Sequence, residues 1–179
     1  MSEQRIAARY AKALFDKAQE EGLLEVVKDN VEELIVLSLE SRDFMLFIQS
    51  PMYKMSAKKK ALESIFSKQH ALTKGMYALM VDKKRESFIP AMGEGFMKMY
   101  NESQKIVLVE VESAVALSNS TISEIESYVK THTSANTVRI NTRLDASIIG
   151  GITIEFNGRI FDNTVLTQLK KIKKELQIA

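Results

Sequence analysis

The sequence predicts a mainly α-helical protein, in which an N-terminal six-helix antiparallel bundle is followed by a small α+β C-terminal domain. Through residues 1–104, apolar side chains recur at the three- and four-residue spacing of helices. At Lys105 the pattern changes to the alternation of β-strands. The 179 residues, 45% of them hydrophobic, are enough for one large or two small cores. We therefore expect two domains, residues 1–104 and 105–179.

The first three helices are predicted from apolar stripes and from residues that start or stop helices. A helix after Ser2 has two adjacent stripes, and Gly22 is suited to end it. Residues 23–39 are expected to form a second helix. Ser41 can cap a short third helix, which must end before Pro51 because proline disfavours helical backbone in the residue ahead of it. The two stripes of the first helix are Ile6, Tyr10, Ala13 and Leu14, and Ala7, Ala11, Leu14 and Ala18.

Three more helices are expected at residues 57–66, 72–81 and 86–103. The last is weakened by Pro90, Gly93 and Gly95, although a proline in the first turn costs little. Two basic runs have simple structural interpretations. Lys58, Lys59 and Lys60 are expected on a solvated helix face, and Lys83, Lys84 and Arg85 at a helix end, where cations complement the helix dipole.

The C-terminal domain is predicted as strands and helices in alternation. We expect strands at residues 106–111, 137–141 and 151–156, and a helix at residues 117–132 between the first two. Asn157 and Gly158 predict a type I′ hairpin turn into a strand at residues 159–161. A last helix is expected at residues 163–176.

Composition excludes several kinds of active site. The chain has no cysteine, and its only histidines, His70 and His132, belong to no recognisable ligand or catalytic motif. Residues 1–104 carry 16 basic and 15 acidic side chains, and residues 105–179 carry 9 and 8, so nothing global favours nucleic acid. No segment has the pattern of a signal peptide or a membrane span, and we expect membrane association only through partners. We expect no catalytic residue, cofactor or metal.

Three features near the C-terminus have structural interpretations. Gly150 and Gly151 lack the context of a phosphate-binding loop and indicate a backbone bend or a close approach. Asp162 is expected to cap the last helix. That helix is either docked with a solvated basic side, or it meets an acidic protein helix, a membrane surface or nucleic acid. Its apolar seam is Val165, Leu169, Ile172 and Leu176, and Lys170, Lys171, Lys173 and Lys174 occupy its other faces.

The alanine-rich face of the first helix has two interpretations. Small side chains around Tyr10 and Leu14 would let a partner helix approach closely. The same side chains could instead pack against other helices of the bundle. Spacing alone favours the second, because helix faces are usually buried within their own molecule.

Two sequence blocks, in this order and spacing, resemble one family. IAARYAKALF at residues 6–15 and LDASIIGGI at residues 144–152, the latter followed by Asp162 to Val165 and by Leu169, resemble the ATP synthase delta subunit family. This family includes the mitochondrial oligomycin-sensitivity-conferring protein. Similar residues also occur between the blocks, at Ser50-Pro51, at Arg85 and at residues 111–114. The sequence departs from the family at Asn163-Thr164, where Gly-Ser is common, and at Lys83, where Asn or Glu is common.

The resemblance implies a non-catalytic stator subunit of the rotary F-type ATP synthase. Such a subunit links the catalytic head to the peripheral stalk and resists torque during proton-driven ATP synthesis. One copy per complex is expected, on the cytoplasmic face of the bacterial inner membrane. The C-terminal domain would contact the b subunits of the stalk, and the N-terminal helix of an alpha subunit would bind between the first and fifth helices. By position, that groove involves Ala7, Tyr10, Ala11, Leu14, Met76, Leu79, Met80 and Lys83.

Two alternatives to this function remain open. One is an unrelated helical adaptor with the same groove but different partners. The other is a weak nucleic-acid binder that acts through the basic helix at residues 163–176.

Overall fold

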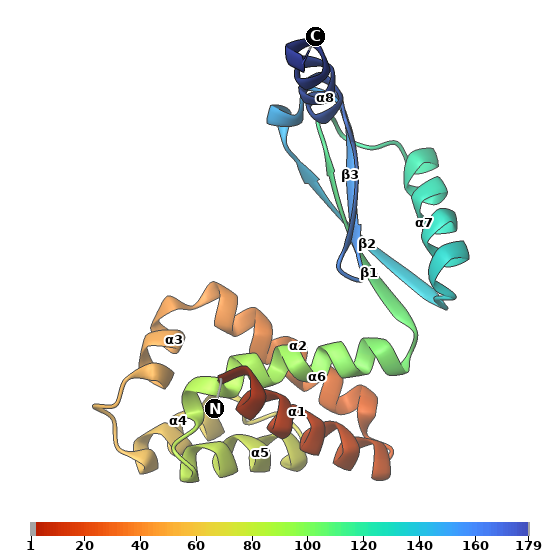
Figure 1. The fold of residues 1–179 in the computed structure, drawn as a ribbon. Coiled ribbons are helices and arrows are strands. Elements are labelled where there is room, and N and C mark those ends of the chain that lie inside the picture. The colour runs from red at the N-terminus through yellow and green to blue at the C-terminus, as the bar shows by residue number, and fades with distance from the viewer. Residues whose placement is uncertain (1–2, 179) are drawn as a thin grey trace. The chain divides into compact units, whose positions relative to one another are not determined.

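The computed structural model describes residues 3–178 and divides the chain into two compact units, Met1–Tyr100 and Asn101–Ala179 (Figure 1). The predicted fold class is confirmed, since helices fill the first unit and a small mixed sheet with helices forms the second. Within the described residues, no helix has the length and hydropathy needed to cross a membrane. The helices of the first unit are α1 (Glu3–Glu20), α2 (Leu24–Glu40), α3 (Arg42–Gln49), α4 (Met55–Ile65), α5 (Ala71–Asp82), the 3-10 turn η1 (Glu86–Phe88) and α6 (Ile89–Ser103), whose last turn extends past the boundary at Tyr100.

The ends of α1 and α3 form as the sequence predicts. Gly22 adopts a positive φ of 67° after α1, and the Leu23 amide donates a 2.8 Å hydrogen bond back to the Ala18 carbonyl. At the start of α3, the Ser41 hydroxyl accepts a 3.2 Å hydrogen bond from the Phe44 amide. These closures satisfy backbone groups that the helices themselves leave without partners.

Helix α6 lies between α1 and α2, and its glycines permit the close packing (Figure 1). A methyl group on Gly93 would come within 3.3–3.4 Å of α2 side chains, and one on Gly95 within 3.1 Å of Ala11 on α1. Gly93 and Gly95 are two residues apart, so they point to opposite sides of the helix. Pro90 occupies the second position of α6, where its missing N–H costs no internal hydrogen bond.

The prediction of a solvated lysine face on α4 is wrong for Lys58. Its side chain is 1% exposed, and its ammonium group lies 2.6 Å from a Glu86 carboxylate oxygen and 2.8 Å from the Ile48 carbonyl oxygen. The ammonium group thereby ties α4 to η1 and to the last turn of α3. Lys59 is partly exposed and pairs with Asp82 at 2.6 Å, and Lys60 is exposed.

The second unit contains a four-stranded mixed sheet. Helix α7 connects the parallel strands β1 and β2 and covers one face of the sheet (Figure 1). The other pairs, β1 with β3 and β3 with β4, are antiparallel, and the strand order is β2-β1-β3-β4. The elements are β1 (Ile106–Ser113), α7 (Asn119–Thr133), β2 (Thr137–Leu144), the 3-10 turn η2 (Ala146–Ile148), β3 (Gly151–Phe156), β4 (Arg159–Thr164) and α8 (Val165–Ile178).

The core of the second unit is small and mostly aliphatic. Alternate residues of β1 point toward α7 and pack with Ile125 and Val129. Phe156 at the end of β3 closes this cluster and stacks on Phe161 of β4, with ring centroids 5.4 Å apart. Between β3 and β4, Asn157 and Gly158 both have positive φ, 50° and 71°, as the predicted type I′ turn requires.

The last helix begins later than predicted, and its cap differs. Strand β4 continues to Thr164, so α8 starts at Val165. The Thr164 hydroxyl accepts a 3.2 Å hydrogen bond from the Thr167 amide, which is the bond of an N-cap. Asp162 supports this cap from two residues earlier, because it accepts hydrogen bonds from the Thr164 amide at 2.9 Å and the Thr167 hydroxyl at 2.7 Å.

Candidate functional site

Half of the eight predicted groove residues are buried. They lie on the inward stripes of α1 and α5 and expose at most 3% of their surface. Side chains this deeply buried hold the helices together and cannot offer a surface to a partner. The four are Ala7, Ala11, Leu14 and Met80.

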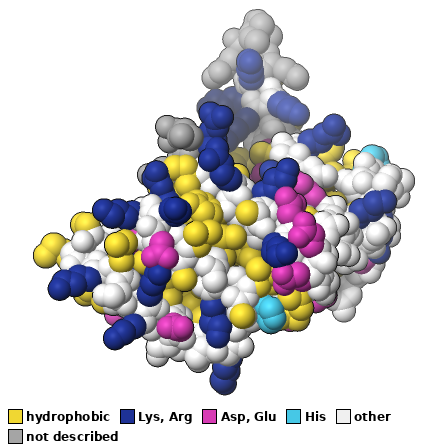
Figure 2. All heavy atoms as spheres, turned by 90° about the horizontal axis from the view of Figure 1, so that it is seen from below, with side chains coloured by type: hydrophobic (Ala, Val, Ile, Leu, Met, Phe, Trp, Pro, Cys, Tyr) yellow, Lys and Arg dark blue, Asp and Glu magenta, His cyan; other side chains and the backbone are white. Residues whose placement is uncertain are grey.

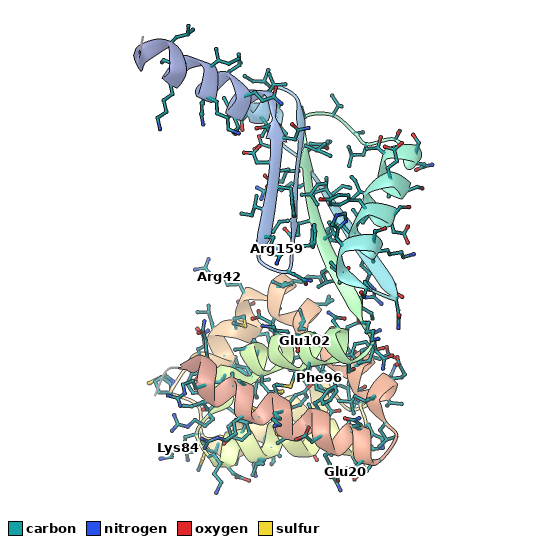
Figure 3. All side chains as sticks on the ribbon, turned by 45° about the vertical axis from the view of Figure 1, so that its right-hand side comes forward. Glu20, Arg42, Lys84, Phe96, Glu102 and Arg159 are labelled. Carbon is teal, nitrogen blue, oxygen red and sulfur yellow. The ribbon has the colours of Figure 1, made fainter. Side chains whose placement is uncertain are left out.

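The small residues of α1 are explained by packing inside the bundle. Ala11 lies against Gly95 of α6, and the Phe15 and Phe96 rings pack with centroids 5.9 Å apart. Phe96 points into the interior of the unit (Figure 3). A larger side chain at Ala11 would push α1 away from α6, so the alanine serves the fold.

The other four residues line the outer side of the contact between α1 and α5. Tyr10 and Met76 are half-buried, Leu79 is 43% exposed and Lys83 is exposed. Ile6, one helical turn before Tyr10, is also half-buried. We use the term α1–α5 groove for the surface formed by Ile6, Tyr10, Met76, Leu79 and Lys83.

This outer surface is apolar and bordered by charges. Figure 2 views the first unit from below, where α1, α4 and α5 lie in Figure 1. Hydrophobic side chains form a band across this face, with Lys and Arg along its upper left and a group of Asp and Glu to its right. An apolar strip with charged borders suits an amphipathic helix better than a small polar ligand.

One end of the groove contains a cavity of about 280 Å³. The cavity joins the first turns of α1 to the segment that follows α5, and Tyr10 and Lys83, both named by the family resemblance, line it together. Ile6 also lines it, a residue that the predicted set omitted although its stripe was recognised. The lining consists of Arg5, Ile6, Arg9, Tyr10, Lys83 and Arg85.

The buried tyrosine of α5 is not suited to acid–base chemistry. Tyr77 on α5 is 1% exposed. Burial raises the pKa of its phenol far above the ordinary value, and the Glu33 carboxylate raises it further. The phenol therefore stays protonated at physiological pH, in contrast to the near-neutral pKa that a general base needs.

The histidines have structural positions. The His70 Nδ1 accepts a 3.2 Å hydrogen bond from the Leu72 amide and so caps α5. The His132 ring packs at a tilt against Tyr128 of the same helix, with ring centroids 4.1 Å apart. Among the described residues, no three His, Cys, Asp or Glu side chains gather in a way that could hold a metal ion.

In the second unit, the apolar seam of α8 is largely uncovered. Val165 is 37% exposed, and Leu169, Ile172 and Leu176 are 50%, 51% and 73% exposed. The first turn of α8 contacts η2 and β4, and Val165 lies against Gly150 in the loop before β3. The seam is therefore a second candidate surface for a partner protein.

Comparison with known proteins gives consistent results along the whole chain. A model of the family described as ATP synthase delta (OSCP) subunit matches residues 6–176. A Synechocystis protein named ATP synthase subunit delta is 32% identical over 176 residues, which cover 98% of this chain and 95% of that protein. A protein of the same name from Moorella thermoacetica is 30% identical over the full length of both.

Among solved structures, a chain from the mitochondrial ATP synthase hexamer of Toxoplasma gondii has the same fold. It superposes with a TM-score of 0.78 over 96% of this chain and 97% of its own length. Sequence identity between the two is 19%. The fold is thus preserved where most side chains differ.

Proposed function

Because the chain belongs to the ATP synthase delta (OSCP) subunit family, we propose that it is a non-catalytic stator subunit that links the catalytic head to the peripheral stalk. The central shaft exerts torque on the head, and a connector that resists this torque must dissociate slowly. Burial of an amphipathic helix in an apolar groove supplies slow dissociation without chemistry. The expected location is the cytoplasmic face of the bacterial inner membrane, with one copy per complex.

The N-terminal unit is proposed to bind the N-terminal helix of an alpha subunit in the α1–α5 groove. The observation that supports this most directly is the apolar outer stripe formed by Tyr10, Met76 and Leu79 on two adjacent helices. Of the eight residues predicted from the resemblance, we propose that these three and Lys83 contact the helix. The buried set of Ala7, Ala11, Leu14 and Met80 holds the two helices in place beneath it.

A single substitution tests this site. Tyr10→Asp places a charge in the groove and should weaken binding of a peptide that copies the alpha-subunit N-terminus by more than about tenfold. Tyr10 is only half-buried, so the far-UV circular dichroism should not change. Tyr53→Asp is the matched control, because Tyr53 is 51% exposed in the loop before α4. Equal affinity of Tyr10→Asp and the wild type would refute the assignment.

The C-terminal unit is proposed to contact the b subunits, with the exposed seam of α8 as the supporting observation. Leu169→Asp should reduce capture of the b subunit and leave binding of the alpha-subunit peptide unchanged. If capture of b is unaffected while the variant remains folded, the contact lies elsewhere on this unit. Binding of single-stranded DNA by the wild type, with an affinity that falls steeply as the salt concentration rises, would instead favour a nucleic-acid surface on the lysines of α8.

A further inference from the structure

Four cations surround the cavity at the end of the α1–α5 groove. Arg5 and Arg9 come from α1, and Lys83 and Arg85 follow α5. All four are exposed, and the cavity lining includes no carboxylate. We use the term cationic corner for these four residues.

The carboxylates next in sequence to Lys83 and Arg85 are already paired with lysines of another helix. Asp82 pairs with Lys59 at 2.6 Å, and Glu86 pairs with Lys58 at 2.6 Å. Both partners lie on α4. Among the described side chains, no acidic group forms an ion pair with a member of the cationic corner.

Helix capping explains only part of this cluster. Lys83 and Arg85 follow the C-terminal end of α5, where positive charge is favourable. Arg5 lies in the first turn of α1, where positive charge opposes the helix dipole. Like charges gathered at one cavity also repel one another. Local stability therefore does not account for the convergence of all four residues.

We propose that the cationic corner binds a carboxylate carried by an Asp or Glu of the helix that docks in the α1–α5 groove. This inference rests on the proposed function and adds a chemical requirement for the partner. The floor of the corner is Ile6 and Tyr10, which continue into the apolar groove. An apolar floor favours an acidic residue within an amphipathic helix over a free anion or a lipid headgroup.

The test is a double-mutant cycle between protein and peptide. One peptide copies the alpha-subunit N-terminus, and a second has each Asp and Glu replaced by Asn and Gln. The protein variants are Arg9→Gln/Lys83→Gln and, as a control with the same change in charge, Arg42→Gln/Lys68→Gln. Arg42 and Lys68 are exposed, outside the corner and the groove. Affinities are measured by fluorescence anisotropy at low and high salt.

We expect Arg9→Gln/Lys83→Gln to reduce the affinity for the acidic peptide by about five- to twentyfold at low salt, with a smaller reduction at high salt. The same variant should lose much less affinity for the neutral peptide, because there Lys83 contributes only its packing in the groove, and the difference between the two losses is the coupling that the cycle measures. Arg42→Gln/Lys68→Gln should bind both peptides normally. These results together would establish the carboxylate contact.

The possible contrary results are distinguishable. Equal binding of both peptides to the wild type would overturn the cationic corner and leave the groove intact. If neither peptide binds the wild type, both the cationic corner and the proposed function are overturned. Vesicles that contain phosphatidylglycerol test the lipid source. If they bind the wild type but not Arg9→Gln/Lys83→Gln, while the peptides show no discrimination, the corner is a lipid site and the inference is wrong.

Discussion

Gly95 packs so closely against Ala11 that a methyl group on Gly95 would lie 3.1 Å from the Ala11 Cβ. This contact sets the distance between α6 and α1 and so fixes the position of α1, the helix that carries Tyr10. The shape of the surface around Tyr10 therefore depends on Ala11 and Gly95, which pack inside the bundle. A larger side chain at this contact tests that dependence.

Ala11→Leu should destabilise the protein by about 1–3 kcal/mol, because Ala11 is fully buried and leucine would overpack the contact. Urea denaturation measures the change. Ala8→Leu is the matched control, since Ala8 is exposed on the same helix and should have little effect. If Ala11→Leu were as stable as the wild type but bound the alpha-subunit peptide poorly, Ala11 would belong to the binding surface itself.

The buried ion pair between Lys58 and Glu86 should be costly to break on one side only. Lys58→Ala leaves the Glu86 carboxylate without its partner and should cost about 3 kcal/mol. The double variant Lys58→Met/Glu86→Leu should recover most of that stability, because no buried charge remains. Denaturant midpoints of the three proteins provide the measurement, with Lys60→Ala as the exposed control. If the double variant were less stable than Lys58→Ala, the ion pair itself would stabilise the fold.

The sequence predicted those features that depend on neighbouring residues. The stop at Gly22, the cap at Ser41 and the turn at Asn157 and Gly158 are each determined by a few adjacent side chains. These features appear in the structure where they were expected. The two stripes of α1 were also recognised correctly from their spacing.

Features that need a distant partner could not be predicted in this way. Lys58 is buried because Glu86 meets it, and Glu86 lies 28 residues later. Nothing in the α1 pattern shows that Ala11 faces Gly95, so the inward stripe could not be told from the outward one. The convergence of Arg5 and Arg9 with the segment after α5 likewise depends on the packing of the two helices.

Helices α1 and α5 end in the same way with different residues. After α5, Lys84 adopts a positive φ of 56° while the Arg85 amide donates to the Met80 carbonyl at 2.8 Å. Gly22 has the corresponding place after α1. Lys84→Gly should therefore stabilise the protein by about 0.5–1 kcal/mol, because glycine adopts this conformation without strain.

The reciprocal substitution tests the same reasoning. Gly22→Ala should destabilise the protein by about 1 kcal/mol, since open space surrounds Gly22 and only its backbone conformation opposes a side chain. Both changes are read from thermal unfolding. Two shifts of the same sign would show that something other than the positive φ governs these helix ends.

The Asp162 carboxylate should make the start of α8 sensitive to acid. The hydroxyl of Thr167 and the amide of Thr164 donate to this carboxylate and lower its pKa below the ordinary 3.8. Since the pKa is lower in the folded state, the stabilisation is present above 3.8 and is lost as the pH falls through the folded-state value.

Asp162→Asn should therefore reduce stability at about pH 7, and the difference from the wild type should shrink toward about pH 3. Thermal unfolding at several pH values provides the measurement, and the Thr164 and Thr167 amide resonances report the local change. Glu124→Gln is the control, because Glu124 is an exposed carboxylate on α7. A stability difference that is constant across this pH range would show that the carboxylate charge is not responsible.

Gly151 is the position in the C-terminal unit at which a side chain should be least tolerated. Its φ is 81°, and an added Cβ would overlap the Asn163 carbonyl oxygen on the paired strand β4. That obstacle is backbone, which cannot move aside without separating the two strands. Gly151→Ala should therefore cost about 2–4 kcal/mol, as strain at a positive φ adds to the overlap.

Gly158→Ala is the control, because Gly158 also has a positive φ but lies in open space. Hydrogen exchange of the β3 and β4 amides measures the effect, which should be large for Gly151→Ala and modest for Gly158→Ala. Equal exchange in the two variants would attribute the whole cost to backbone conformation and exclude the close approach of β4.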